Sequence, residues 1–137
     1  MKKIIFYFVI SLIAIACNSV SQEDCTNYDY SDCNTIAPDS GLLNINLTIN
    51  GENSKVPIAI YKGKYENGNK ISEDTLTVST ASYSLPVNNY YSVRAKYKSQ
   101  NKIIFAIDGG EITVKKNYIC DSTCWSVKSA NADVRLK

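Results

Sequence analysis

Apolar and polar residues alternate with a period of two along much of the chain. In residues 43–49 every second residue is apolar and the others are polar. Because successive side chains of a strand point to opposite faces, this pattern predicts a half-buried β-strand. Comparable patterns predict further strands around residues 56–60, 76–78, 83–87, 91–97, 112–114 and 134–136. No window has a convincing helical period.

Three further segments carry their own expectations. Residues 103–107 are almost continuously apolar, which predicts a central strand buried on both faces. The Asp108-Gly109-Gly110 run after them predicts a tight turn, and residues 63–69, with two glycines, predict a loop. Short strands at a spacing of roughly 8–12 residues are typical of sandwiches and barrels. We therefore expect an all-β fold, a small antiparallel β-sandwich of about seven or eight strands.

The first residues have the pattern of an export signal. Lys2 and Lys3 precede residues 4–16, which are apolar apart from Ser11. As a helix this segment would span about 20 Å, short of the roughly 30 Å hydrocarbon core of a bilayer. Residues 1–16 are therefore predicted to be a signal peptide and not a membrane span.

The end of this segment, Ala14-Ile15-Ala16-Cys17, resembles the lipobox of bacterial lipoproteins, although Ala14 stands where the family prefers Leu. The resemblance implies that Cys17 is diacylated and becomes the new N-terminus, which anchors the protein to a membrane. Asn18 stands where an Asp marks inner-membrane retention in the enterobacterial scheme, and Ser21-Gln22-Glu23-Asp24 resembles the acidic export signals of Bacteroidota surface lipoproteins. Both resemblances imply an outer-membrane location in the cell envelope, either periplasmic or on the surface. The alternative is an ordinary cleavage site with an incidental cysteine.

Charge divides the exported chain into an acidic and a basic part. Of 15 Lys and Arg and 13 Asp and Glu residues, Lys2 and Lys3 lie in the signal, which leaves 13 of each. Residues 18–54 carry six acids and no base. Residues 18–40 also have little apolar content, so residues 17–40 are predicted to be an acidic tether and residues 41–137 a mildly basic domain. This excess is too small for a nucleic-acid binder. The basic domain is either simply solvated or meets lipid head groups or acidic glycan.

Four cysteines remain after Cys17, and an even number in an exported protein predicts two disulfides. They are Cys25, Cys33, Cys120 and Cys124. Three pairings are open: one forms two local rings and two cross-link the chain ends. A zinc site is the alternative, but the spacing differs from paired C-x₂-C motifs, so we expect no metal.

Catalytic groups are scarce. Histidine, the commonest general base, is absent, and no serine stands in a G-x-S-x-G motif. The closest carboxylate pairs, Glu73-Asp74 and Asp108…Glu111, fall in predicted turns, where acids are common for local hydrogen bonding. We therefore expect no enzyme and no cofactor.

Aromatic residues are the candidate ligand contacts. The chain has ten tyrosines but only three phenylalanines and one tryptophan. Tyr65, Tyr90, Tyr118 and Trp125 fall near predicted loops or beside a cysteine, and exposed aromatics stack on sugars or anchor protein interfaces. The alternative is that tyrosines fill strand positions in the core or at its rim, and that Trp125 packs on a disulfide.

Basic residues form a second candidate, a row around the fifth strand made of Arg94, Lys96, Lys98 and Lys102. Such a row can meet phosphate or acidic sugar. The alternative is a solvated face, or an edge strand that charge protects from aggregation.

Residues 81–95 (ASYSLPVNNYYSVRA) resemble the central hairpin of transthyretin-like, carboxypeptidase-regulatory-like domains, and residues 56–61 resemble their second strand. Asn88-Asn89 replaces the usual glycine at the turn, which asparagine tolerates because it adopts the left-handed conformation. The resemblance implies an immunoglobulin- or transthyretin-like sandwich that serves as a non-catalytic module, with no active site to carry over.

These features together predict a lipid-anchored envelope protein that acts as a non-catalytic binding or assembly module for an envelope protein partner. One alternative is a surface glycan-binding lipoprotein that uses exposed tyrosines. Another is a minor envelope hydrolase.

Overall fold

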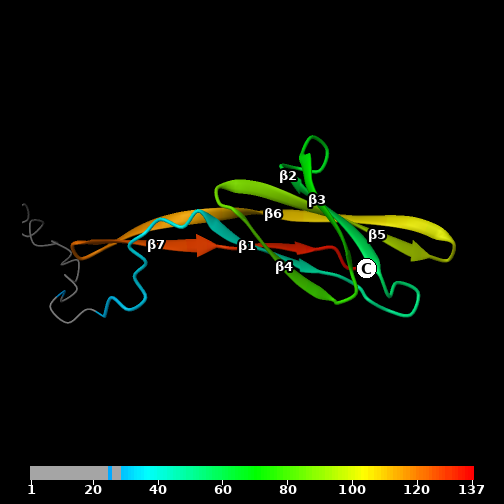
Figure 1. Ribbon diagram of the computed structural model, residues 1–137, viewed down its shortest axis with the longest axis horizontal. Coiled ribbons are helices and arrows are strands. Elements are labelled where there is room, and N and C mark those ends of the chain that lie inside the picture. Colours follow the sequence, from blue (N-terminus) through cyan, green and yellow to red (C-terminus); the bar gives the residue numbers. More distant parts are fainter. Residues whose placement is uncertain (1–24, 26–28) are drawn as a thin grey trace, which may run out of the picture. The chain divides into compact units, whose positions relative to one another are not determined.

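The computed structural model describes Cys25 and residues 29–137 (Figure 1). The chain divides into two units, residues 1–31 and 32–137, and every strand found in the described residues lies in the second. In the first unit the Ser31 backbone N–H donates a hydrogen bond to Asp29 Oδ1 at 2.9 Å. Cys17 and the signal segment lie outside the described residues, so lipidation remains a prediction. Within the part that is described, no helix has the length and apolarity to cross a membrane.

Between residues 29 and 137, eight strands form two sheets. They are β1 (Ser40–Asn46), β2 (Val56–Lys62), β3 (Asn69–Leu76), β4 (Thr80–Pro86), β5 (Asn89–Ser99), β6 (Lys102–Ile119), β7 (Ser122–Lys128) and β8 (Ala130–Asp133). One sheet has the order β4-β1-β8 and the other β3-β2-β5-β6-β7. The strands pair antiparallel apart from β1 and β8, which are parallel. The expected all-β sandwich is confirmed.

The core lies between the sheets and follows the period-two pattern. Alternate residues of β1, β2 and β5 are buried, among them Leu43, Ile60 and Val93. Tyr97 is fully buried, and its hydroxyl donates to the Val134 carbonyl at 2.8 Å and accepts from the Thr48 backbone N–H at 3.1 Å. This tyrosine therefore fills a core position and fixes the chain after β8.

At the turn between β4 and β5 the chain passes from one sheet to the other. Asn88 has a φ of 57°, the left-handed conformation expected for asparagine at this turn. β4 belongs to the three-stranded sheet and β5 to the five-stranded one, so the hairpin expected over residues 81–95 is wrong. The segment instead carries the chain from one sheet to the other.

Two strand boundaries differ from expectation. β3 begins inside the segment expected to be a loop and ends at Leu76, and Val78 lies outside it with 55% exposure. The final strand, expected around residues 134–136, is β8 and ends at Asp133. Val134 is nevertheless buried, because core packing continues beyond the last ladder pair.

The turn expected at Asp108-Gly109-Gly110 is also wrong, because β6 runs straight through it. A Cβ on Gly109 would collide with the Tyr91 carbonyl oxygen and lie 2.8 Å from Ser92 Cα. A Cβ on Gly110 would lie 3.3 Å from Ala130 Cβ. These glycines permit the close approach of neighbouring segments of the chain. This is one of the structural roles of glycine within a strand.

The second half of β6 forms an extension with β7, which the alternation did not predict. Residues 113–119 pair with β7, and Figure 1 shows this hairpin continuing the line of β6. We call residues 113–128 the β6–β7 arm. Asn34 forms a bridge to Trp125, whose backbone N–H donates to the Asn34 carbonyl at 2.8 Å.

The arm is also cross-linked to the segment before β1. Cys33 and Cys124 form a disulfide that spans 91 positions of sequence. Cys25 and Cys120 each take part in a disulfide as well. The expected disulfides are confirmed, and the Cys33–Cys124 bridge excludes the arrangement of two local rings. In the chain-entropy model a first bridge that closes a loop of this length contributes about 4.6 kcal/mol.

Candidate functional site

The candidate site is the outer face of the five-stranded sheet, the face turned away from the core. Val93, Ala95 and Tyr97 of β5 are buried against the core, so the alternating residues Arg94, Lys96 and Lys98 share the outer face. Lys102 pairs with Ser99 and lies on the opposite face. The basic row expected from the sequence is therefore three residues long on this face.

An apolar row on β6 lies beside these cations. Ile103 is opposite Lys98, Phe105 is opposite Lys96 and Ile107 is opposite Arg94. These three apolar residues are 45–56% exposed. The expectation that residues 103–107 are buried on both faces is wrong, because no layer of described residues covers the outer face here.

One end of the outer face is covered by the loop between β2 and β3. The Ser92 hydroxyl, buried under this loop, donates to the Gly63 carbonyl at 2.8 Å. Tyr65 of the loop lies beside Arg94, whose guanidinium carbon is 5.9 Å from the Tyr65 ring centroid and 5.1 Å from that of Phe105. The guanidinium is thus within cation–π distance of two aromatic rings.

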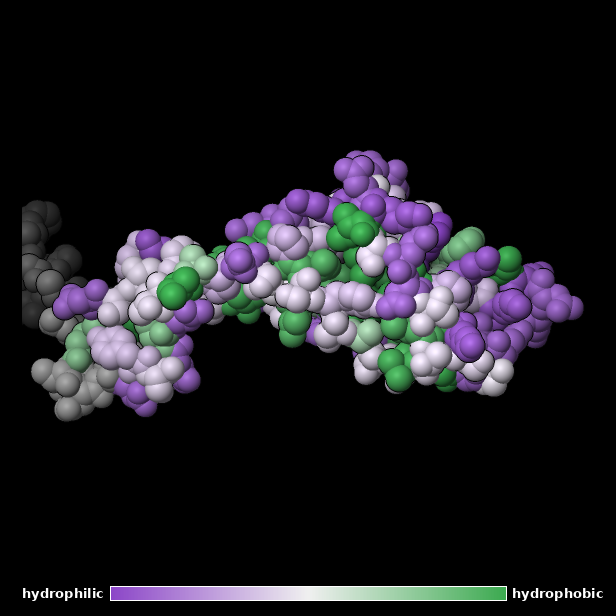
Figure 2. All heavy atoms as spheres, viewed as in Figure 1, coloured by the Kyte–Doolittle hydropathy of each residue, from purple (hydrophilic) through white to green (hydrophobic). Residues whose placement is uncertain are grey.

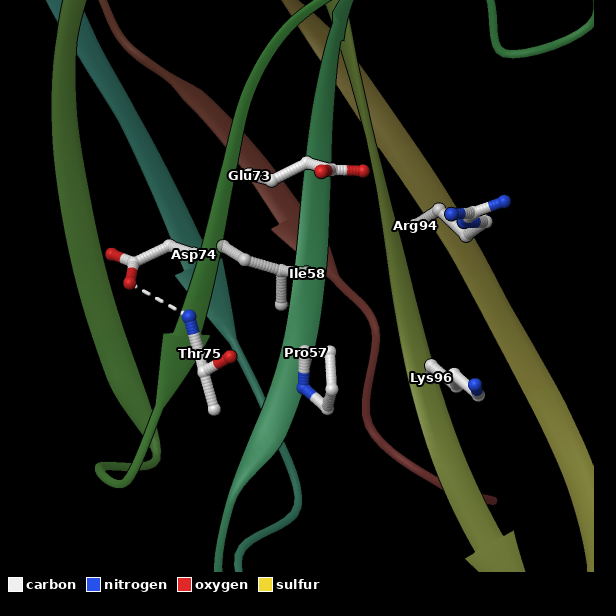
Figure 3. A pocket seen from close by; sticks show the side chains of 7 residues that line it. All are labelled: Pro57, Ile58, Glu73, Asp74, Thr75, Arg94 and Lys96. Atoms are coloured by element: carbon white, nitrogen blue, oxygen red, sulfur yellow. Dashed lines mark hydrogen bonds between the residues drawn. The ribbon is translucent and has the colours of Figure 1, made fainter.

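A shallow groove runs along the outer face. One hollow of about 310 Å³ has Pro57, Glu73, Arg94 and Lys96 in its lining (Figure 3). A second, of about 370 Å³, shares Pro57 and Lys96 with the first, so the two are continuous. The second hollow is also lined by Lys55 and Lys98. We call the two together the cationic groove.

The cations of the groove differ from its acids in their partners. Among the described residues, Lys55, Lys96 and Lys98 form no ion pair within 4 Å. Glu73 is paired with Lys70 at 2.7 Å, and Glu52 accepts a hydrogen bond from the Gln100 backbone at 3.1 Å. Figure 2 shows hydrophilic surface gathered at the end of the sandwich where β5 leads into β6. The groove therefore offers positive charge that the chain itself does not neutralise.

The Glu73-Asp74 pair does not form an acid–base couple. The residues lie in β3 and not in the expected turn, and they point in opposite directions (Figure 3). A hydrogen bond from Lys70 lowers the pKa of Glu73, and hydrogen bonds from Tyr83 and Thr75 lower the pKa of Asp74. Glycoside hydrolysis needs one carboxyl that stays protonated, and here both are ionised.

The partner of Asp74 shows the reciprocal effect. The Tyr83 hydroxyl donates to Asp74 Oδ2 at 2.7 Å. Burial and this carboxylate raise the pKa of Tyr83 to about 12. The pair connects β3 to β4 of the other sheet, which is a structural role.

The other carboxylate pair is also separated. Asp108 and Glu111 lie within β6, not in a turn, and three positions apart on a strand they point to opposite faces. Asp108 Oδ2 accepts a hydrogen bond from the Asp133 backbone N–H at 2.7 Å. In the described part of the chain, no three residues of the metal-binding types His, Cys, Asp and Glu are grouped to hold a metal ion.

The candidate aromatic residues fall into two groups. Tyr65 and Tyr90 line one hollow of about 210 Å³ on the five-stranded sheet. Tyr118 and Trp125 lie on the β6–β7 arm, where Lys116 Nζ is 4.7 Å and 5.6 Å from their ring centroids. Only the first two tyrosines are brought to a common hollow.

Sequence reasoning missed two parts of the groove. Pro57 and Lys55 were not candidates, although a proline in β2 and a lysine just before it do stand beside the expected basic row. The exposure of Phe105 was also missed. The sequence shows a lysine row in β5 and an apolar row in β6. That these two rows lie side by side can be inferred only once the pairing register of the strands is known.

Comparisons with known proteins add no relative: no protein-family model, curated protein or solved structure matches the chain.

Proposed function

We propose that the protein is a lipid-anchored, non-catalytic binding module of the bacterial cell envelope whose cationic groove binds an acidic segment of an envelope protein partner. The observation that carries this proposal is the row of Arg94, Lys96 and Lys98 on an open sheet face. The lipobox-like segment that ends at Cys17 supports the anchor and the compartment.

The chemistry of the groove favours binding over catalysis. Three lysines in it have no ion pair among the described residues, whereas its carboxylates are engaged by Lys70, Tyr83 and backbone groups. An acidic ligand would meet these cations without displacing internal contacts. The adjacent exposed side chains of Phe105 and Ile107 supply apolar area, and a mixture of cationic and apolar contacts is typical of protein interfaces.

The proposal is tested by capture in the organism's own cells. The lipidated protein is cross-linked, purified, and compared with the variant Lys96→Glu/Lys98→Glu. Lys128→Glu on β7, an exposed cation away from the groove, is the matched control. We expect one stoichiometric envelope protein with the wild type and the control, and its loss with the double variant. Capture that all three proteins share, or that none shows, contradicts the proposal.

A second candidate function, glycan binding, rests on the hollow that Tyr65 and Tyr90 line together with Lys64, Glu66 and Asp108. Tyrosine rings stack on sugars, and charged groups at the rim bind hydroxyls. In this case Tyr90→Ala lowers retention on envelope polysaccharide, whereas Lys96→Glu/Lys98→Glu does not.

A further inference from the structure

One edge of the five-stranded sheet is open along the first half of β6. β5 pairs with residues 102–112 along one side of β6, while β7 pairs with only residues 113–119 on the other side. Among the residues that the structure describes, no strand pairs with the second side of residues 102–108. We call this segment, KIIFAID, the 102–108 edge.

The 102–108 edge is apolar and exposed. Ile103 is 56% exposed, Ile104 40%, Phe105 49% and Ile107 45%, so four of five consecutive residues present large apolar side chains to solvent. An open strand edge also presents unpaired backbone N–H and C=O groups. Proteins commonly protect such edges with charge, and here charge is confined to the two ends, Lys102 and Asp108.

We propose that this edge pairs with the same edge of a second copy, antiparallel, about a two-fold axis that passes between the two Phe105 residues. The segment is self-complementary in this register. Lys102 faces Asp108 of the other copy, Ile103 faces Ile107, and Ile104 faces Ala106. Opposite charges and large apolar residues directly across an antiparallel pair are stabilising.

The charges select this register over its neighbours. A two-fold axis perpendicular to the sheet keeps each residue on its own face, so alternative registers differ by two positions. Those registers place Lys102 opposite Ala106 or Gly110, and Asp108 then lacks its cation. Asp108 uses Oδ2 to accept from the Asp133 N–H, which leaves Oδ1 to accept from Lys102 of the second copy.

The symmetry also explains why the occupant is a second copy and not an unrelated strand. A two-fold contact needs one surface that complements itself, and KIIFAID does so in both apolar size and charge. Two five-stranded sheets would join into one sheet of ten strands. Both outer faces would lie on the same side, so the two cationic grooves would act together on a ligand.

The test uses cysteines placed in the exported full chain and assayed by non-reducing electrophoresis of the envelope. Phe105→Cys lies opposite itself, so we expect a disulfide-linked dimer. Ile103→Cys alone faces Ile107 and gives little dimer, whereas Ile103→Cys/Ile107→Cys gives dimer again. Ile71→Cys on β3 is the control at another exposed edge, and it stays monomeric. Mass spectrometry of the linked peptide identifies both halves as this chain.

Charge exchange tests the register without cysteines. In sedimentation of the detergent-solubilised protein, Lys102→Asp weakens self-association by about tenfold, since a like charge then faces Asp108 twice in each dimer. The double variant Lys102→Asp/Asp108→Lys restores it. Equal dimer yield from Phe105→Cys and Ile71→Cys, linkage of Phe105→Cys to a different protein, or a monomeric wild type overturns the proposal. Capture through the cationic groove is lost with Lys96→Glu/Lys98→Glu and not with Lys102→Asp, so failure of either proposal is distinguishable.

Discussion

The five-stranded sheet has two edges of opposite character. On β3 the exposed residues include Lys70, Glu73 and Asp74, and the first two form an ion pair at 2.7 Å. The 102–108 edge instead exposes three isoleucines and a phenylalanine. The edge at β3 has the charged composition that keeps a strand in solvent, whereas the 102–108 edge has the composition of a contact surface. Edges of one sheet can therefore serve different purposes.

The edges differ also in their covalent links to the rest of the chain. β6 continues into the arm, which the Cys33–Cys124 disulfide joins to the segment before β1, and β3 has no such covalent link. The largest expected effect follows from removing this bridge. Cys33→Ser/Cys124→Ser lowers the free energy of unfolding by about 3 kcal/mol, the value for a short ring, because the remaining disulfide still cross-links the unfolded chain. Urea unfolding measures this loss, and a change below about 1 kcal/mol would contradict the assigned role.

The bridge also shows where sequence reasoning ends. Four cysteines predict two disulfides, but spacing does not choose among three pairings, because the choice depends on which strands are neighbours. The alternation of Leu43, Ile45 and Leu47, by contrast, directly predicted β1 and its buried face. β7 was missed because its sequence, STCWSVK, has few aliphatic residues and packs largely against its partner strand.

β5 and β6 approach each other closely at Gly109, which directly follows the 102–108 edge. Gly109→Ala places a methyl group against the Tyr91 carbonyl and Ser92 Cα, and we expect a loss of about 1–3 kcal/mol of stability. Gly51→Ala, where nothing lies within 4 Å, is the control and changes stability by less than about 0.5 kcal/mol. Equal unfolding midpoints for the two variants would show that the close approach at Gly109 is absent.

The wrong prediction of a turn at Asp108-Gly109-Gly110 arises from this same close approach of β5. A glycine pair predicts a turn when only local conformation is considered. Here the neighbouring backbone of β5 leaves no room for a side chain at Gly109. That requirement depends on the tertiary structure and cannot be read from the sequence. The apolar run 103–107 was misread for a related reason, since apolar content indicates that a surface is to be covered but not which molecule covers it.

The candidate site was predicted in part. The alternation in β5 identified Arg94, Lys96 and Lys98 as one row, and the structure places them on one face. The position of Arg94 over the Phe105 ring, and of Lys96 in one hollow with Pro57, depends on strand order, which the local pattern does not contain. Tyr65 and Tyr118 were candidates for the same reason, proximity to loops, yet they lie on different elements.

The two edges are compared directly by one substitution in each. Ile103→Lys and Ile71→Lys both place a charge on an exposed strand residue, so each changes the free energy of unfolding by less than about 0.5 kcal/mol. Only Ile103→Lys weakens self-association, by about tenfold, because the lysine then faces Ile107 of the second copy. Sedimentation of both variants checks this, and equal behaviour would remove the distinction between the edges.

The smallest effect is a pH dependence at two carboxylates, one in each sheet. A hydrogen bond from Arg135 lowers the pKa of Asp133 to about 2, and Tyr83 lowers that of Asp74. Because both pKa values lie below those of the unfolded chain, each contribution is present above about pH 4 and is lost as the pH falls. Asp133→Asn removes one titrating carboxylate, so the variant lacks the decrease in stability that protonation of Asp133 causes between about pH 4 and pH 2. Thermal unfolding across pH 2–5 measures it, and an unchanged acid limb would contradict the assignment.

Hydrogen–deuterium exchange of the full, detergent-solubilised protein tests the contrast between the edges most directly. An amide on an open edge exchanges quickly and becomes protected when another strand pairs with it. As protein concentration rises, we predict growing protection of those amides in residues 102–108 that point away from β5, and unchanged exchange in β3. Exchange in residues 102–108 that stays fast at every concentration, or protection that rises equally in β3, would contradict the account.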